Sequence, residues 1–433
     1  MSFVIKETYL TYIYHSGFNY GSTKVQKVGD DRLLKKFLKI LLVVFVILAN
    51  MFYNDLSYAD DISDDEPIDY LFNQESVEAV GKNIPKISAG AAIVIDVASG
   101  RVLYEKNAYT RRSIASTTKI MTAIVAIENG KENEDVIVSK KAASISGSQV
   151  NLQEGKTYKL GDLLYAMMLR SGNDAAIAIA EHVGGSEEAF AEMMNRKAAE
   201  IGATNTNFVT PHGLDNPQHY STPYDLALIT QYALRNEKFC KIVGTKASTF
   251  MGSNITNTNE MLSLYPGADG VKTGYTGQAG RCLVTSATHD GWRVISVVLN
   301  CSSRSVRAQS SKTLLDYAFN NYKSREYLKE GQRISDIKLH KGLEDNIPLY
   351  SDRDISIPLK EEEAAKLETI YNFSGEIEAP VKIYSKVGTI DYRLDGKLLA
   401  SADIITHNEI GRKDFYFYFN KIFKSWTGLV RGK

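Results

Sequence analysis

The chain has few cysteines and no excess of charge of either sign. Its 433 residues include only three cysteines, Cys240, Cys282 and Cys301, which are too few for a disulfide framework. Cys282 and Cys301 lie in apolar strand-like runs, so buried free thiols are expected, and a single Cys282–Cys301 pair stays open as an alternative. Lys+Arg and Asp+Glu number 51 each, so nothing in the overall charge indicates binding to nucleic acid.

The sequence also lacks the usual motifs of cofactor and metal sites. No Walker or Rossmann glycine pattern is present, so no nucleotide cofactor is expected. His212 and His219 lie in a loop-like segment without an H-E-x-x-H helix, so neither a zinc site nor a histidine-based triad is expected. A hydrophobic content of 44% with 24% charged residues is typical of a globular protein, and the length indicates two or three domains.

No uninterrupted apolar run is long enough for a typical membrane-spanning helix, and the N-terminal part of the chain carries a shorter one. Lysines precede the apolar segment Ile40–Ala49, and small residues suited to signal cleavage follow at Ser57 and Ala59. This run is short for a membrane-spanning helix, but it can be extended over 33–52 if its lysines are tolerated. Residues 1–59 are therefore expected to be a signal peptide or an uncleaved N-terminal membrane segment, and the protein is expected to be exported.

After an acidic linker over 60–85, residues 86–325 mix the two kinds of periodicity. Alternating apolar residues predict hairpins, and apolar residues at i, i+3, i+4 and i+7 predict helices. The expected hairpins lie at 92–104 and 281–300, and the expected helices at 116–128, 162–170, 174–182, 186–201 and 304–322. This order predicts an α/β domain with an antiparallel sheet flanked by helices.

The C-terminal part of the chain has a different texture. Residues 326–408 show short alternating runs without long amphipathic helices, which predicts a small all-β domain. Residues 409–433 predict an amphipathic helix with cations on one face, and its other face gathers Phe415, Tyr418, Phe419, Ile422, Phe423, Trp426, Leu429 and Val430. Such a helix suits a membrane surface, and the alternative is a helix docked on the protein itself.

Three short motifs in a fixed order carry the chemistry. They are Ser116-Thr117-Thr118-Lys119, Ser171-Gly172-Asn173 and Lys272-Thr273-Gly274. Together they supply a nucleophile, an amine as its base, a polar relay and a cationic clamp, which suffices for serine acyl transfer without histidine. Ser335-Asp336-Ile337-Lys338 also fits S-x-x-K and is interpreted as a chance match.

Each motif residue has a chemical role that its type can serve. On a helix, Lys119 lies one turn from Ser116 on the same face, and burial with a second cation can keep its amine neutral. Lys272 is the candidate second cation, and Ser171 can pass a proton to a leaving amine. The alternative is that Ser116 caps a helix and both lysines lie on the surface, but three motifs in order disfavour it.

The sequence around these motifs resembles the serine-type D-alanyl-D-alanine carboxypeptidases, the low-molecular-mass penicillin-binding proteins of peptidase family S11. The resemblance is strong over about 86–325 and weaker over the β-domain and terminal helix. It is carried by Ala115-Ser-Thr-Thr-Lys-Ile-Met-Thr122, Met168-Leu-Arg-Ser-Gly-Asn-Asp-Ala-Ala176, Asp269-Gly-Val-Lys-Thr-Gly-Tyr-Thr276 and Pro211-His-Gly-Leu-Asp215. One departure is Ile114, where the family usually has proline.

The resemblance implies a catalytic domain of the β-lactamase/transpeptidase-like type and a role for each motif residue. Ser116 would be the nucleophile, Lys119 its base and Ser171 part of the proton relay, and the backbone N–H groups of Ser116 and Tyr275 would form the oxyanion hole. Substrate contacts would come from Asn173, Lys272, Thr273, Gly274 and Tyr275. The enzyme would need no cofactor.

The implied reaction removes the terminal D-alanine from peptidoglycan stem peptides that end in D-Ala-D-Ala, which limits cross-linking. β-Lactams would acylate the same serine and inhibit the enzyme. The implied location is the outer face of the bacterial cytoplasmic membrane, with the terminal helix on the membrane surface.

Three other functions stay open from the sequence. A β-lactamase would share the first motif but hydrolyse penicillin rapidly, and a D,D-endopeptidase would cut cross-links but usually lacks the C-terminal module. A non-enzymatic wall-binding or scaffolding protein on an inactive catalytic fold is the third. The intact motifs argue against it.

Overall fold

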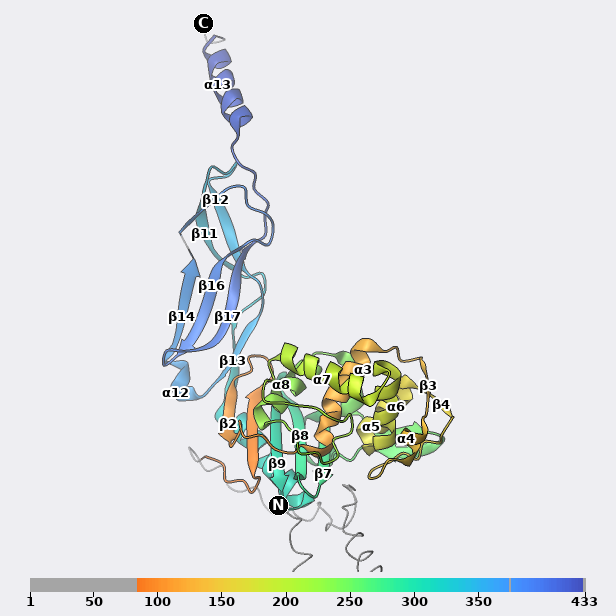
Figure 1. The fold of residues 1–433 in the computed structure, drawn as a ribbon. Coiled ribbons are helices and arrows are strands. Elements are labelled where there is room, and N and C mark those ends of the chain that lie inside the picture. Colours follow the sequence, from red (N-terminus) through yellow and green to blue (C-terminus); the bar gives the residue numbers. More distant parts are fainter. Residues whose placement is uncertain (1–83, 374, 431–433) are drawn as a thin grey trace, which may run out of the picture. The chain divides into compact units, whose positions relative to one another are not determined.

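The computed structural model describes residues 84–373 and 375–430 (Figure 1). The expected export segment, 1–59, and nearly all of the acidic linker lie outside the described residues. All the described residues belong to one unit, Tyr58–Lys433. Within them, no helix combines the length and the apolar character needed to cross a membrane.

A five-stranded antiparallel sheet forms the centre of the first domain, in the order β2-β1-β9-β8-β7. Its strands are β1 (Ala91–Asp96), β2 (Val102–Lys106), β7 (Ala268–Thr276), β8 (Gly280–His289) and β9 (Trp292–Cys301). Every residue of β1 is buried, because both faces of the sheet are covered. Ile93 belongs to the core on one face and Val94 to the core on the other, as the alternation of a strand requires.

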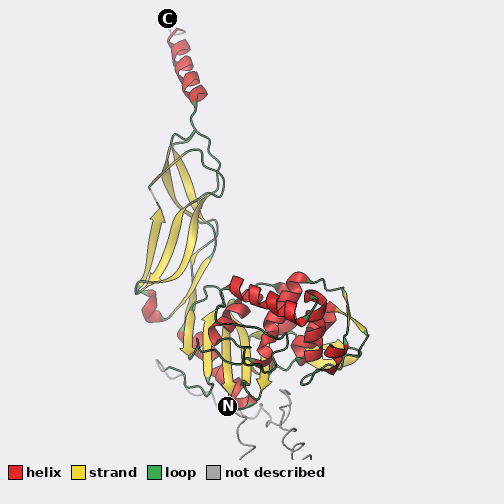
Figure 2. Cartoon of the chain, viewed as in Figure 1, coloured by secondary structure: helices red, strands yellow, loops and turns green. Residues whose placement is uncertain are grey.

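Helices α11 (Arg304–Asn321) and α10 (Met261–Leu264) cover one face of this sheet, and the other helices of the domain cover the opposite face (Figure 2). That second group comprises the 3₁₀ turn η1 (Ala115–Thr118), α3 (Lys119–Asn129), α4 (Lys140–Ser144), α5 (Leu160–Arg170), α6 (Asn173–Gly184), α7 (Glu187–Ile201), α8 (Pro223–Ala233) and α9 (Glu237–Gly244). Two small hairpins complete the domain, β3 (Asp135–Ile137) with β4 (Thr157–Lys159) and β5 (Ala247–Phe250) with β6 (Ser253–Thr256).

The cysteines are free thiols, as expected from the sequence. Cys282 belongs to the core on the helical face of the sheet, whereas Cys301 belongs to the core beneath α11. The two side chains therefore lie on opposite faces of the sheet, and the alternative Cys282–Cys301 disulfide does not form. Burial raises the pKa of Cys301 to about 12, so this thiol stays protonated.

The second domain is all-β, as predicted, apart from one helical turn, α12 (Glu361–Ala364). A two-stranded ladder joins β10 (Lys323–Leu328) to β13 (Ile355–Leu359). A six-stranded sheet follows in the order β14 (Leu367–Phe373), β16 (Lys386–Leu394), β17 (Lys397–Thr406), β12 (Asn346–Ser351), β11 (Arg333–His340) and β15 (Glu376–Glu378). Its own apolar core includes Ile347, Leu349, Ile357, Ile390 and Ile404.

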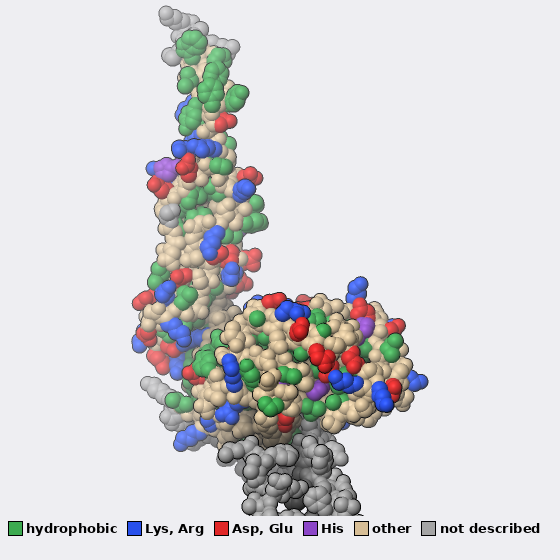
Figure 3. Space-filling model, in the orientation of Figure 1, with side chains coloured by type: hydrophobic (Ala, Val, Ile, Leu, Met, Phe, Trp, Pro, Cys, Tyr) green, Lys and Arg blue, Asp and Glu red, His purple; other side chains and the backbone are tan. Residues whose placement is uncertain are grey.

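Helix α13 (Phe415–Val430) ends the described chain. The Asp414 carboxylate accepts a hydrogen bond of 2.8 Å from the Phe417 backbone N–H, which caps the first turn. Phe415, Phe419, Ile422 and Trp426 are all exposed, with 52–75% of each side chain accessible. Figure 3 shows hydrophobic side chains gathered on this helix.

A buried ion pair connects α11 to the start of α10. The Arg307 guanidinium is completely buried and donates to both carboxylate oxygens of Glu260 at 2.8 Å. Its Nε also donates to Glu260 at 3.1 Å, so the pair has fork-like geometry. Each charge is compensated by the other, with the arginine side chain fully buried and the glutamate side chain 8% exposed.

We expect Arg307→Met to lower the free energy of unfolding by about 3–5 kcal/mol, because it leaves the Glu260 carboxylate buried without its partner. The double variant Arg307→Met/Glu260→Leu should recover most of this loss. Urea unfolding of the two variants and the parent protein tests both statements. Equal losses in the single and double variants would show that the packing of Arg307, not the ion pair, provides the stability.

Candidate active site

The turn that carries Ser116 is held by hydroxyl groups. Thr117 Oγ1 donates to the Ile114 carbonyl at 2.6 Å, and Thr118 Oγ1 donates to the Ala115 carbonyl at 2.7 Å. Ala115 has a positive φ of 46°, which is unusual for alanine. The two threonines therefore hold a strained turn that places Ser116 immediately before α3, where the sequence predicts the nucleophile.

Lys119 is completely buried beneath Ser116. Its Nζ lies 2.9 Å from Ser116 Oγ, 2.7 Å from Asn173 Oδ1 and 2.9 Å from the His212 carbonyl oxygen. A neutral amine has two N–H groups and one lone pair. The amide oxygen of Asn173 and the carbonyl oxygen of His212 can each accept a hydrogen bond from one N–H group. The lone pair is then left to accept the proton of the Ser116 hydroxyl. The geometry is that of a general base in contact with its nucleophile.

The electrostatic surroundings favour the neutral form of this amine. Burial is the largest cause that lowers the pKa of Lys119 well below its ordinary value, and the positive charge of Lys272 lowers it further. Asp174 acts in the opposite direction. Lys272 is itself buried, so its charge acts on Lys119 from within the protein.

Ser171 and Asn173 occupy the junction between α5 and α6. Ser171 ends α5 with a left-handed φ of 61°, and both side chains are 2% exposed. The Asn173 side-chain N–H group donates to the Ser146 carbonyl at 2.8 Å, so its oxygen is turned toward Lys119. The three short contacts of Lys119 Nζ go to other groups, and the proton relay through Ser171 stays a prediction.

Strand β7 brings the third motif against the nucleophile's turn. A Cβ on Gly274 would lie 2.9 Å from the Ser116 nitrogen and 3.1 Å from the Thr117 nitrogen, so only glycine allows this approach. The next residue, Tyr275, is stacked by Arg281, whose guanidinium carbon lies 4.2 Å from the ring centre. Thr273 is buried, and its hydroxyl lies 2.8 Å from the Thr258 hydroxyl.

Two contributors were missed by the sequence reasoning. The His212 carbonyl oxygen accepts a hydrogen bond from Lys119. Every residue type has a backbone carbonyl, so the sequence cannot indicate this contact. Thr258 was missed because it belongs to none of the motifs, although it supports Thr273 from a neighbouring loop. His212 contacts the Lys119 amine through its backbone oxygen and not through its ring.

His219 supports the turn through a chain of hydrogen bonds. Its Nδ1 accepts from the Val209 backbone N–H at 3.1 Å, so Nε2 carries the proton and donates to Thr118 Oγ1 at 2.8 Å. Thr118 in turn donates to the Ala115 carbonyl. Burial lowers the pKa of His219 from its ordinary value of 6.5 to about 4, so the ring is neutral near pH 7.

No metal site was found in the described part of the chain, where no three His, Cys, Asp or Glu side chains are placed to hold an ion. A buried lysine beside a serine on a helix, with a polar loop and a lysine-bearing strand around it, has the parts of a serine acyl-transfer enzyme.

Comparison with known proteins narrows this class. The sequence model of the D-alanyl-D-alanine carboxypeptidase family matches residues 77–303, and that of the penicillin-binding protein 5 C-terminal domain matches residues 322–412. The chain belongs to the D-alanyl-D-alanine carboxypeptidase family, and it is a serine-type hydrolase.

Individual relatives match this chain over most of their own length. D-alanyl-D-alanine carboxypeptidase DacF of Bacillus subtilis is 35% identical over 350 residues, which covers 78% of this chain and 90% of the relative. DacA of Escherichia coli is 34% identical over 373 residues, covering 82% and 92%. The crystal structure of penicillin-binding protein 5 from Haemophilus influenzae has a TM-score of 0.69 and 32% identity, and it covers 77% of this chain and 100% of that chain.

We expect Gly274→Ala to slow acylation by roughly 10²–10³-fold, because the added methyl displaces the backbone that carries the Ser116 N–H. Gly375→Ala is the control, since its Cβ meets open space. Mass spectrometry of the intact protein mixed with an excess of ester substrate gives the acylation rate. Parent-like acylation of Gly274→Ala would show that this close approach is not needed for the reaction.

We also expect His219 to make stability depend on pH. Its pKa is lowered in the folded protein, so below about pH 6.5 the unfolded chain binds a proton that the folded chain does not. This contribution is complete above pH 6.5 and is lost as pH falls toward about 4. His219→Gln, whose amide can both accept and donate, should lose less stability than the parent between about pH 7 and about pH 5 in urea unfolding. An identical pH dependence in both proteins would contradict this assignment.

Proposed function

We propose that this protein removes the terminal D-alanine from peptidoglycan stem peptides by acyl transfer through Ser116. The observation that carries the proposal is the contact of 2.9 Å between Ser116 Oγ and the buried Lys119 amine. The names of the relatives supply the substrate class, since D-alanyl-D-alanine carboxypeptidases release D-alanine from peptides ending in D-Ala-D-Ala.

In the first half-reaction, Ser116 Oγ attacks the carbonyl carbon of the D-Ala–D-Ala bond while its proton passes to Lys119 Nζ. The negative charge on the former carbonyl oxygen is stabilised by the backbone N–H groups of Ser116 and Tyr275. The C–N bond then breaks, and the leaving nitrogen receives the proton from Lys119 through the Ser171 hydroxyl. The products are free D-alanine and an ester on Ser116.

In the second half-reaction, water gives a proton to the Lys119 amine and attacks the ester carbon. The bond to Ser116 Oγ breaks, and the proton returns to that oxygen. During the first half-reaction, before D-alanine leaves, Lys272 and Thr273 hold the terminal carboxylate of the substrate, and the Thr258 hydroxyl fixes the Thr273 hydroxyl at 2.8 Å. Asn173 keeps Lys119 in register through its contact of 2.7 Å.

β-Lactams should bind at the same residues, because their ring carbonyl and carboxylate match the reacting groups of the dipeptide. The relatives also argue against the other functions considered from the sequence. The match to the penicillin-binding protein 5 C-terminal domain extends the similarity through the β-domain, and the relatives are named as carboxypeptidases.

We expect Ser116→Ala to lower D-alanine release from a diacyl-Lys-D-Ala-D-Ala tripeptide by at least about 10⁴-fold. Labelling by a fluorescent penicillin should be lost as well. The control is Ser335→Ala, which removes the serine of the other S-x-x-K match on β11 and should keep both activities. Penicillin labelling that survives in Ser116→Ala would identify a different nucleophile.

We propose further that helix α13 holds the enzyme on the outer face of the bacterial cytoplasmic membrane. Aromatic and aliphatic side chains on one face are accessible, and Lys421 and Lys424 lie on the other face toward anionic headgroups. Burial of one phenylalanine in a membrane contributes about 1.5–3 kcal/mol. Several such side chains together suffice for stable surface binding.

The membrane role predicts a difference between adjacent positions on α13. Phe419→Asp should weaken co-sedimentation with vesicles containing phosphatidylglycerol by roughly tenfold or more, because the apolar face loses an anchor and gains a charge. Asn420→Asp adds the same charge on the polar face and should have a smaller effect. Equal effects of the two variants would show that binding depends on net charge and not on insertion of this face.

A further inference from the structure

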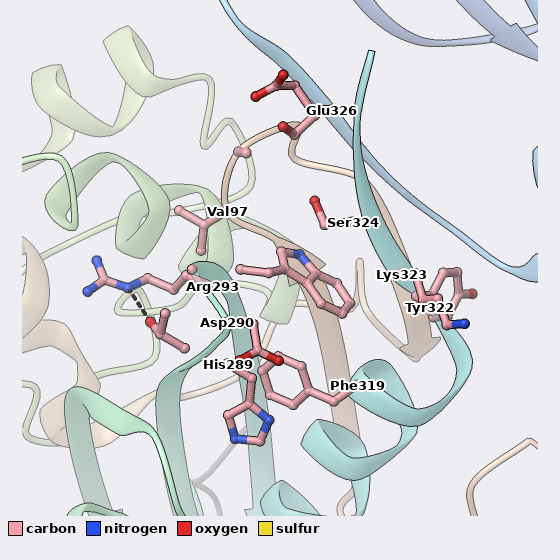
Figure 4. A pocket seen from close by; sticks show the side chains of 14 residues that line it. Val97, His289, Asp290, Arg293, Phe319, Tyr322, Lys323, Ser324 and Glu326 are labelled. Carbon is pink, nitrogen blue, oxygen red and sulfur yellow. Dashed lines mark hydrogen bonds between the residues drawn. The ribbon is translucent and has the colours of Figure 1, made fainter.

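A cleft lies outside the active site, where the turn between β8 and β9 meets the end of α11 and strand β10 (Figure 4). Its volume is about 820 Å³, within the ~300–1,000 Å³ typical of ligand sites. None of the proposed catalytic or substrate-binding residues lines it. The cleft is therefore a separate place on the protein with room for a ligand.

Aromatic rings in fixed positions line one part of the cleft. The His289 and Phe319 rings are stacked with centroids 4.0 Å apart, and Trp292 meets Phe319 edge-on at 5.2 Å. Trp292 Nε1 donates to Asp96 at 2.8 Å, and His289 Nε2 donates to the Pro266 carbonyl at 2.9 Å. Because these ring N–H groups are already bonded, the aromatic cluster offers the cleft mainly its apolar surface.

The polar groups of the cleft include side chains of both charges and two hydroxyl groups. Asp290, Lys323 and Glu326 are exposed at its margin, and the hydroxyls of Ser324 and Ser356 also line it. Arg293 is committed to Asp269, with Nε–Oδ2 and Nη2–Oδ2 distances of 2.9 and 2.8 Å. No single sign of charge dominates, so the lining favours neither a polyanion nor a polycation.

A neutral ligand with apolar faces and hydroxyl edges matches this lining. A pyranose ring presents C–H groups on its face, which pack on aromatic rings, and hydroxyl groups at its edge, which bond to carboxylates, amines and hydroxyls. We propose that this cleft binds saccharide units of the peptidoglycan glycan strand. The choice of this saccharide rests on the proposed function, because the glycan strand is the part of the wall polymer to which the stem peptides are attached.

Such a site would bind the polymer and take no part in the chemical reaction. The cleft is lined both by the catalytic domain, through Phe319, and by β10 and β13 of the β-domain, through Ser324 and Ser356. A glycan strand held there would stay near the enzyme between cleavage events. Substrates attached to glycan would then have a lower KM than free peptides, with the same kcat.

The binding test uses the two tryptophans of the chain, Trp292 and Trp426. In Trp426→Phe, Trp292 is the one remaining tryptophan, which can be excited selectively over the tyrosines, and it lines the cleft. Titration with a soluble oligomer of N-acetylglucosamine should change its emission with saturation. Adding Ala98→Phe, which fills the cleft from the turn between β1 and β2, should weaken this binding by at least roughly tenfold.

The matched control is Ala199→Phe, the same change at an exposed position of α7 away from the cleft. It should leave the titration unchanged. No saturable response in Trp426→Phe, or an equal loss in both alanine variants, would overturn the proposal. A response to a stem peptide without sugar, and none to the saccharide, would overturn it in favour of a peptide site.

Kinetics separates this inference from the proposed function. Ala98→Phe should hydrolyse the diacyl tripeptide like the parent but show a several-fold higher KM for glycan-linked pentapeptide. If the parent protein does not hydrolyse the tripeptide, the proposed function is wrong. The saccharide titration then tests binding in the cleft independently. Equal KM values for glycan-linked substrate in the variant and the parent would remove the inference alone.

Discussion

A buried lysine amine in contact with a serine hydroxyl is the interaction on which the rest of the site depends. Burying an ammonium without compensation is costly, so the surroundings of Lys119 must either satisfy its charge or keep it neutral. They do both, since three oxygens lie within 2.9 Å and the nearby Lys272 disfavours a second positive charge. The turn η1, helix α6 and the loop at His212 each supply one of these oxygens, so all three segments must come together before the amine has its partners.

The backbone is strained at two positions near this lysine, one before Ser116 and one at Ser171. Ala115 and Ser171 have positive φ values, and neither is glycine. Gly213 lies so close to the Ala115 carbonyl that a Cβ would be 2.0 Å from its oxygen. Conformations of this kind cost about 1–3 kcal/mol each and persist only where the surrounding structure determines them. Here the hydrogen-bonded chain from His219 through Thr118 and the close approach of β7 provide that determination.

The sequence predicted the parts of the structure that depend on local pattern. The hairpins of the central sheet, α11 and the helices beside Ser171 all follow from periodicity and turn residues. The motifs also predicted which side chains meet, because Ser116 and Lys119 are one helical turn apart. The sequence could not predict the His212 carbonyl as a partner of Lys119, since a backbone atom has no residue signature. The hydroxyl pair of Thr258 and Thr273 was missed because it depends on a loop whose path tertiary packing decides.

In the proposed mechanism, Lys119 passes through two protonation states, and the same geometry suits both of them. As a neutral amine it donates to Asn173 and the His212 carbonyl and accepts the proton of Ser116. As an ammonium it needs a third acceptor, and Ser116 Oγ then lies in that place at 2.9 Å. The same three oxygens would therefore serve both forms of the amine in the proposed transfer from Ser116, which limits the reorganisation that this step needs. Burial makes the neutral state accessible, and the three oxygens keep the charged state from disrupting the fold. A base that met only one of these requirements would be either protonated and inactive or unable to hold the proton it takes.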